Sequence, residues 1–368
     1  MKSDLFIPSE ETDKNNYYLF LFSRLNGVGS KTIIALLQKF GSPSNLYQAV
    51  LDQKQILNNK IYYLLQDKNF ILDSQKAFEA LAEDYITILN PLYPSDLKNI
   101  YDPPLFLFYK GNIALLKNKY LLTIVGSRTS TNYHSSTVKS IFNDLKQTPL
   151  VIVSGLAIGI DALSHREALA NNLPTIAVLG SGLSKEILYP QENVALAEEI
   201  IAKGGLLISE QSSQTKTQLY HFPKRNRILA GLSKATIVIS GALKSGTLIT
   251  AQVALDEGRE VLALPGNVNL KLSQGPNKLI KEGASVIDSA LDIFKIYNID
   301  KNILRVSPIL ENPAQAKIYT LLQAEATNLV DLSKSLSLPL AKVNVLISQM
   351  ELAGIVRYNN LNQLEIIS

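Results

Sequence analysis

The sequence contains no cysteine, so disulfide bonds and zinc sites built on thiolates are both excluded. Its three histidines, His134, His165 and His221, stand at no spacing that metal ligands use, so we expect no metal and no cofactor. No stretch approaches the roughly 18 uninterrupted apolar residues of a membrane helix, and the first residues lack the apolar segment of a signal peptide. These absences predict a soluble, cytoplasmic protein without a membrane partner.

Acidic residues are missing from two long stretches of the chain, although the net charge of +4 is small. The stretches run from Pro103 to Asn143 and from Gln211 to Leu255. Their basic residues are Lys110, Lys117, Lys119, Arg128 and Lys139 in the first, and Lys216, Lys224, Arg225, Arg227, Lys234 and Lys244 in the second. We interpret them as a positive surface that faces an anion; the alternative is a chance cluster of solvated side chains.

The N-terminal part of the chain, residues 1–85, is predicted to be a helical module. Apolar residues recur at helical spacing from residue 17 to about 80. The sequence Gly27-Val28-Gly29 between two such segments is typical of a helix-hairpin-helix, whose turn can offer N–H groups to a phosphate. A module of this kind (helix-hairpin-helix-like or SAM-like) could equally pack on its neighbour without touching DNA.

Residues 86–298 change to a strand-and-helix alternation after a Pro- and Tyr-rich lead-in segment. Regular alternation with Val/Ile-rich strands predicts an α/β fold, a Rossmann-like doubly wound parallel sheet. The expected strands are Leu121–Val125, Leu150–Val153, Thr175–Leu179, Leu206–Ser209, Thr236–Ser240 and Val261–Leu264. This alternation is the strongest structural signal in the sequence.

The C-terminal residues 314–368 follow a turn-rich linker at 299–313. Three helical segments, the last at Leu340–Ala353, precede an alternating hairpin through Asn359-Asn360. This order predicts a winged helix. Its expected recognition helix carries Lys342 as its one cation, so docking to a protein partner is as good an interpretation as DNA contact.

Small and polar residues follow five of the predicted strands, where parallel sheets bind their ligands. Glycines in such turns let backbone N–H groups approach an anion closely. The segments are VGSRTS (125–130), SGLAIGID (154–161), LGSGLS (179–184), SGALKSGT (240–247) and LPGN (264–267). Because Thr247 stands where a P-loop has its lysine, and no full dinucleotide fingerprint follows the first strand, we interpret the edge as a site for another anion.

The segment FPKRNR (222–227) places cations in the first turn of a predicted helix, where the helix dipole disfavours them. A docking polyanion would satisfy both these side chains and the free N–H groups, and Phe222 offers a face on which a base could stack. Arg128 and Lys244 could complete the groove. The alternative is that Phe222 belongs to the core and that the arginines pair with acids elsewhere.

Several motifs in order resemble the DNA-processing protein A family (DprA, also called Smf). They are VGSR, SGLAIGIDALSHREAL, FPKRNRILAGLS, SGALKSGTLITAQVALDEGREVLALPG and QGPNKLIKEGA, and they span about 120 to 290. The resemblance implies a non-catalytic protein that binds single-stranded DNA entering during natural transformation and loads a RecA-family recombinase onto it. It also implies a homodimer through the Rossmann-like domain.

The resemblance assigns DNA-binding roles to particular positions. A phosphate would lie at the turn that follows the first predicted strand, beside the turn that follows the second strand. The FPKRNR segment would line the DNA pocket opposite the turn at 244–247. The residues are Gly126, Ser127, Arg128, Ser154, Gly155, Phe222, Lys224, Arg225, Asn226, Arg227, Lys244, Ser245, Gly246 and Thr247. The chain departs from the family pattern at His134, where a glycine is usual, and at Ile158, where an arginine is frequent.

Two other functions compete with this interpretation. Nucleotide-cleaving phosphoribohydrolases have a related Rossmann-like sheet and a G-G-x-G-T-x-x-E motif, but Thr250 stands here where that motif has its catalytic glutamate. A hydroxyl cannot replace a carboxylate as general acid or base near neutral pH. The third possibility is an interaction scaffold in which the winged helix does the binding.

Overall fold

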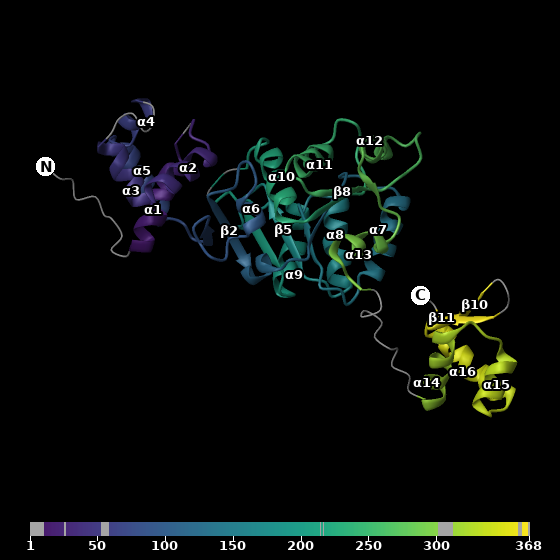
Figure 1. Cartoon of the computed structure of the whole chain (residues 1–368). Helices are drawn as coiled ribbons and strands as arrows, with labels where there is room; N and C mark the ends of the chain where they lie inside the picture. The colour runs from purple at the N-terminus through teal and green to yellow at the C-terminus, as the bar shows by residue number, and fades with distance from the viewer. Residues whose placement is uncertain are drawn as a thin grey trace. The chain divides into compact units, whose positions relative to one another are not determined.

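The structure of the chain is a computed structural model, shown in Figure 1, and it describes residues 11–25, 27–52, 59–213, 215, 217–300, 312–359 and 363–366. The chain divides into two compact units, Met1–Ile299 and Asp300–Ser368, which are treated separately below. Most of the predicted linker at 299–313 falls outside the described residues, as do Lys216 and Asn360. The predicted boundary at residue 85 stays a prediction.

Five helices open the first unit, as the sequence predicts. They are α1 (Glu11–Ser23), α2 (Ser30–Phe40), α3 (Pro43–Asp52), α4 (Asn59–Leu64) and α5 (Lys68–Glu79). In α2, Ile33 and Leu37 lie four residues apart on one face, and both are buried. The Phe20 ring of α1 meets the Phe106 ring of the sheet edge-on, with 5.8 Å between the ring centroids. The helices therefore share one hydrophobic core with the sheet.

A nine-stranded sheet forms the centre of this unit, with the order β1-β2-β6-β5-β4-β3-β7-β8-β9. All neighbouring pairs from β6 to β9 along this order are parallel, whereas β1 and β2 are antiparallel additions at one edge. The strands are β1 (Asp84–Thr87), β2 (Phe106–Gly111), β3 (Leu121–Val125), β4 (Val151–Ser154), β5 (Thr175–Leu179), β6 (Leu206–Ser209), β7 (Ala235–Val238), β8 (Glu260–Ala263) and β9 (Ser285–Val286). The predicted Rossmann-like, doubly wound sheet is confirmed.

The parallel strands are buried on both faces, as their composition requires. Every residue of β3 (LLTIV) and of β5 (TIAVL) is buried. A strand that is covered by helices on both sides has a near-continuous apolar sequence rather than an alternation of apolar and polar residues. All six strands predicted from this pattern are present, with ends that differ by no more than two residues from the predicted ones.

The connecting helices cover the two faces in two groups (Figure 1). Helices α7 to α9 connect β3 to β6 on one face, and α10 to α12 connect β6 to β9 on the other. The helices of this part are α6 (Ser95–Lys98), α7 (Asn132–Asp144), α8 (Ile160–Ala170), α9 (Val194–Ala202), α10 (His221–Leu232), α11 (Gly246–Asp256), α12 (Gln274–Lys281) and α13 (Ala290–Tyr297), with short 3₁₀ turns η1 (Ile113–Lys117), η2 (Gln191–Asn193) and η3 (Lys271–Ser273). The winding reverses between β3 and β7, and ligands of open α/β sheets bind at such a switch point.

The second unit contains three helices and a two-stranded antiparallel hairpin with a core of its own. Its elements are α14 (Pro313–Ala324), α15 (Leu329–Leu336), α16 (Leu340–Leu352), β10 (Val356–Tyr358) and β11 (Leu364–Ile366). Asn328 caps α15, because its side-chain oxygen accepts hydrogen bonds from the N–H groups of Val330 and Asp331. The element order is the one predicted for a winged helix, and that assignment stays a prediction.

Gly159 holds the N-terminus of α8 against the turn after β3, and no other residue fits there. Its φ is +88° and its ψ is −127°, and a Cβ would lie 2.4 Å from the Ser127 carbonyl oxygen. We expect Gly159→Ala to lower the free energy of unfolding by about 2 kcal/mol or more, because backbone strain and a steric clash add together. Urea unfolding followed by circular dichroism measures this loss.

Gly258→Ala is the matched control. Gly258 also has a positive φ, +68°, but nothing lies within 4 Å of a Cβ built there. Only the conformational cost of about 1–2 kcal/mol should therefore remain. Equal losses in the two variants would contradict the close packing of Gly159 against Ser127.

Candidate functional site

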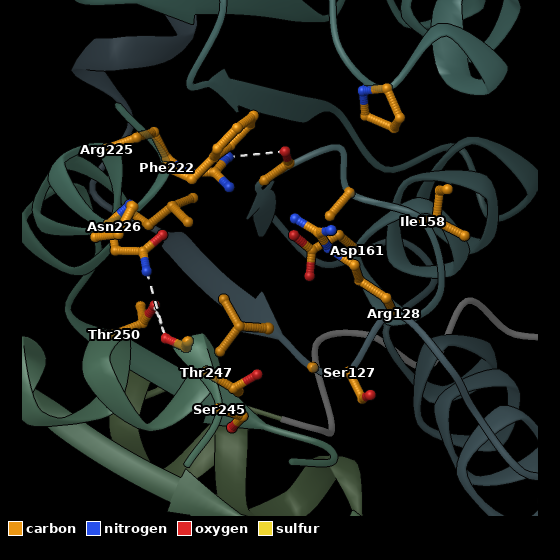
Figure 2. A pocket seen from close by; sticks show the side chains of 18 of the residues that line it. Ser127, Arg128, Ile158, Asp161, Phe222, Arg225, Asn226, Ser245, Thr247 and Thr250 are labelled. Atoms are coloured by element: carbon orange, nitrogen blue, oxygen red, sulfur yellow. Dashed lines mark hydrogen bonds between the residues drawn. The ribbon is translucent and has the colours of Figure 1, made fainter. Parts of the chain in front are cut away.

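A cavity of about 510 Å³ opens beside the switch point between β3 and β7. Its walls come from the turns after β3 and β4 and from the N-terminal turns of α8, α10 and α11 (Figure 2). The volume is in the range of small-ligand sites. Ten of the fourteen predicted site residues line it: Gly126, Ser127, Arg128, Gly155, Phe222, Arg225, Asn226, Ser245, Gly246 and Thr247.

The turn after β3 brings Arg128 to this cavity on a fixed backbone. The N–H of Ser127 donates to the Ser240 hydroxyl at 3.0 Å, and the Ser127 carbonyl accepts from the N–H of Ile160 at 3.1 Å. The side chain of Arg128 is exposed, and within the described ranges it enters no ion pair. Arg128 is therefore a cation that an incoming anion can use.

Arg225 also lines the cavity, but it is a buried structural cation. Only 8% of it is exposed, and its Nη1 donates to the carbonyl of Gly155 at 2.7 Å and to that of Val178. These bonds tie α10 to the ends of β4 and β5. Because α10 begins at His221, Arg225 lies in its second turn, whereas the sequence predicted the first turn. Burial lowers the pKa of the guanidinium, and the nearby carboxylate of Asp161 opposes that effect.

Asp161, in the first turn of α8, supplies the carboxylate that Arg225 faces. A Cβ on Gly155 would lie 2.5 Å from Arg225 Nη1 and 2.5 Å from Asp161 Oδ2, so the two charges flank this glycine. Burial raises the pKa of Asp161 to about 6, while Arg225 and the N–H groups of Gly126, Gly155 and Ala157 oppose the rise. The Asp161 carboxylate therefore lies beside the strand-end turns to which the sequence assigned a phosphate.

Two other predicted contacts, Lys224 and Arg227, do not line this cavity. Glu210 Oε1 lies 3.3 Å from Lys224 Nζ and 2.6 Å from Arg227 Nη2, and Asp102 Oδ2 lies 3.0 Å from Arg227 Nε. Both acids lie just outside the acid-free stretches, and the fold brings them back to α10. The pairing that the sequence left as an alternative therefore holds for these two side chains.

Ser154 and Lys244 are also placed outside this cavity. Ser154 is fully buried, and its hydroxyl donates to the Ile124 carbonyl at 2.6 Å, because it ends the central strand β4. Lys244 is exposed two residues before α11 and borders a neighbouring depression with Leu243 and Lys278. Ser154 is thus a strand residue, and Lys244 is a surface cation that enters no ion pair with the described residues.

The N-terminus of α11 forms one wall of the cavity with Ser245, Gly246 and Thr247. Its first turn carries no acidic side chain, so the helix dipole and free N–H groups face the cavity without a competing carboxylate. The Asn226 amide donates to the Gly246 carbonyl at 3.3 Å and links α10 to α11. This wall can accept a phosphate oxygen.

An aromatic pair, Phe222 and Tyr189, borders the cavity on another side. Phe222 is half-buried, and its ring centroid lies 5.4 Å from that of Tyr189, with the ring planes at 57°. The sequence predicted Phe222, whereas Tyr189 was missed because it lies in a long loop without periodicity. The only local sign of it in the sequence is that an aromatic residue directly precedes a proline. This pair follows the turn after the third predicted strand.

Asp161 and Thr250 are further cavity residues that were not predicted as contacts. The Thr250 hydroxyl, at the position of the glutamate in nucleotide-cleaving enzymes, donates to the Gly246 carbonyl at 3.3 Å. The structure also places the two residues that depart from the family pattern. His134 Nδ1 pairs with Thr131, the residue that caps α7, and Ile158 lies exposed at the cavity wall.

The buried His165 of α8 contacts the sheet rather than Asp161, which lies four residues before it on the same helix. Its Nδ1 pairs instead with the Thr175 hydroxyl of β5 at 2.7 Å. Burial and the Arg225 charge lower the pKa of His165 to about 3, so the ring is neutral at physiological pH.

The described residues contain neither a metal-binding cluster nor a membrane-spanning helix. No group of three or more His, Cys, Asp or Glu side chains there could hold a metal ion. Nor does any helix in those ranges have the length and apolar character needed to cross a membrane.

A doubly wound sheet whose switch point is bordered by helix N-termini, an exposed arginine and aromatic side chains defines a domain of the Rossmann-like class. The chain belongs to the DNA recombination-mediator protein A family, whose model matches residues 84–298. DNA processing protein DprA of Bacillus subtilis is 46% identical over 210 residues, which cover 57% of this chain and 70% of that relative. DprA of Streptococcus pneumoniae is 41% identical over 232 residues, 63% of this chain and 78% of the relative.

Solved structures agree with this membership. The X-ray structure of DprA from Streptococcus pneumoniae matches with a TM-score of 0.66 at 35% identity, over 76% of this chain and 97% of that one. A structure of DprA from Helicobacter pylori, described for its single-stranded DNA binding mode, matches with a TM-score of 0.51 at 30% identity, over 61% and 96%.

The raised pKa of Asp161 predicts a stability effect with a definite sign. Between its ordinary value of 3.8 and the folded value of about 6, the folded state holds a proton that the unfolded state lacks. This contribution to stability is present at low pH and is lost as the pH rises through 6. We expect Asp161→Asn to lose about 1.4 kcal/mol more relative to the wild type at pH 5 than at pH 7. Urea unfolding at the two pH values measures the difference.

His165→Asn provides a control of opposite sign. The folded pKa of about 3 lies below the ordinary 6.5, so neutral His165 stabilises the protein above pH 6.5 and loses this contribution as the pH falls. The stability of the wild type relative to His165→Asn should therefore decrease by about 2 kcal/mol from pH 7 to pH 5. Identical pH profiles for the two variants would contradict the buried charges described here.

Proposed function

We propose that the chain binds single-stranded DNA at the switch-point cavity and acts as a recombination mediator that loads a RecA-family recombinase during natural transformation. The observation that carries the proposal is the combination, in one cavity, of unpaired Arg128, the N-terminus of α11 and the half-buried ring of Phe222. A single strand needs both a phosphate site and a stacking face, and it does not need base-edge donors. The relative from Helicobacter pylori supports the choice of ligand.

The site favours phosphate contacts at Arg128 and α11 over contacts at the paired cations of α10. Glu210 and Asp102 compensate Lys224 and Arg227, and Asp161 compensates Arg225. In this proposal those side chains shape the cavity wall, while Arg128 and the N–H groups of Gly246 and Thr247 meet the backbone of the strand. Ser127 and Asn226 hold the two turns in position.

In this proposal the protein binds DNA and catalyses no reaction. Thr250 donates to a backbone carbonyl where a nucleotide-cleaving relative of the fold would present a carboxylate. The recombinase partner, the homodimer through the Rossmann-like domain and the cytoplasmic location rest on the family resemblance, and they are part of the proposal.

Arg128→Ala tests the phosphate site. We expect binding of a labelled oligo-dT to weaken about tenfold, since a charge-assisted hydrogen bond of about 1.5 kcal/mol is lost. The log–log salt slope should flatten by about 0.7, the value for one phosphate contact on a single strand. Fluorescence anisotropy across a salt series measures both quantities.

Lys117→Ala is the matched control for this charge. Lys117 is exposed and belongs to the same acid-free stretch, but it precedes β3 and so lies at the opposite edge of the sheet from the cavity. It should bind DNA like the wild type. If both variants bind DNA equally weakly, Arg128 contributes only general electrostatic attraction. Failure of the wild type to bind DNA would contradict the proposed function.

Recombinase loading is tested separately. We expect the wild type to accelerate RecA filament assembly on oligonucleotides coated with single-strand-binding protein, because a mediator must hold DNA while the recombinase nucleates. Arg128→Ala should lose this acceleration in proportion to its loss of DNA affinity. Filament assembly can be followed by DNA-dependent ATP hydrolysis of the recombinase. If the wild type binds DNA but does not accelerate filament assembly, the protein is a single-strand-binding protein and not a mediator.

A further inference from the structure

We propose that Tyr189 is a second base-stacking residue, which holds the nucleobase next to the one on Phe222. This inference rests on the proposed function, since it assigns a further subsite to the same cavity. Tyr189 lines the cavity and packs on the Phe222 ring, yet 44% of it stays exposed and accessible to a ligand. Within the described part of the chain its hydroxyl makes no hydrogen bond, so the ring is not held in place by a polar contact of its own.

The backbone beneath Tyr189 is held at several points. Its N–H donates to the buried Ser181 hydroxyl at 3.0 Å. The side chain of Gln191 donates to the Leu188 carbonyl at 2.7 Å, and that of Asn193 to the Leu156 carbonyl at 2.8 Å. An exposed aromatic ring on a pre-organised loop loses little conformational entropy when a ligand binds, which is the property of an anchor rather than of a mobile surface side chain.

The geometry of the ring pair sets how bases can bind. A base sandwiched between two parallel rings needs about 7 Å between them, twice the contact distance of about 3.5 Å. The centroids of Tyr189 and Phe222 are 5.4 Å apart and their planes meet at 57°, so no base fits between them. Each ring instead offers its outer face to a different base, and the two bases belong to successive nucleotides of one strand.

The surroundings favour a nucleobase of a strand over a free mononucleotide. One phosphate position is provided by Arg128 and α11, and a mononucleotide bound there would need only one stacking face. A second face beside the first is used only when a further base follows along the backbone. Stacking on a π-face tolerates every base, so the subsite fits DNA of any sequence.

The experiment compares Tyr189→Leu, Tyr189→Phe and wild type for binding to two labelled strands of about 16 nucleotides, one oligo-dT and one entirely abasic. We expect Tyr189→Leu to bind oligo-dT about 5- to 150-fold more weakly, which corresponds to 1–3 kcal/mol at 1.4 kcal/mol per tenfold. It should bind the abasic strand like the wild type and keep the wild-type salt slope, because no phosphate contact is altered. Tyr189→Phe should restore oligo-dT binding.

Tyr101→Leu is the control for loss of an exposed tyrosine. Tyr101 is 71% exposed and its ring lies under Lys31, away from the cavity. It should bind both strands like the wild type.

Equal weakening of Tyr189→Leu on both strands would assign Tyr189 a structural role and overturn the inference, as would unchanged oligo-dT binding. A Tyr189→Leu variant that loses dTMP affinity as strongly as oligo-dT affinity would point to a mononucleotide site instead. Failure of the wild type to bind either strand would overturn the proposed function itself.

Discussion

The buried pair formed by Asp161 and Arg225 is the interaction on which the candidate site depends. Arg225 is the fifth residue of α10, beyond the first turn in which the sequence placed it, and it is almost inaccessible to water. It is tolerated because Asp161, at the start of α8, provides a carboxylate across Gly155 and because two strand-end carbonyls accept its hydrogen bonds. The two charges, which come from helices on opposite faces of the sheet, thus face one another across Gly155 at one edge.

This arrangement divides the cations of the site into two kinds. Arg225 and Arg227 are compensated by acids that come from other elements, so they support the wall of the cavity. Arg128 stands on a turn held by Ser240 and Ile160, and it keeps its charge free. A site that binds a polyanion reversibly benefits from this division, because the structural charges keep the cavity in shape when the ligand leaves.

The sequence predicted the sheet well because its signal is local. Strands such as LLTIV and TIAVL are apolar except for one threonine each, and each is followed by glycine, so their existence and ends can be found from composition and turn chemistry. The same locality explains the ten predicted residues that line the cavity, since they belong to turns that must meet at the carboxyl edge of a parallel sheet. Tyr189 escaped prediction because its loop reaches the cavity without any periodic pattern.

The doubly wound fold, the edge of the sheet that carries the candidate site and the family could all be predicted from the sequence. Which charges are compensated depends on the tertiary structure. Glu210 precedes one acid-free stretch and Asp102 the other, and they lie far apart in the chain, yet both reach Arg227. Charge pairing depends on distances of a few ångströms between distant segments, which no local pattern encodes. The cations that looked most available in the sequence are therefore the ones that the fold neutralises.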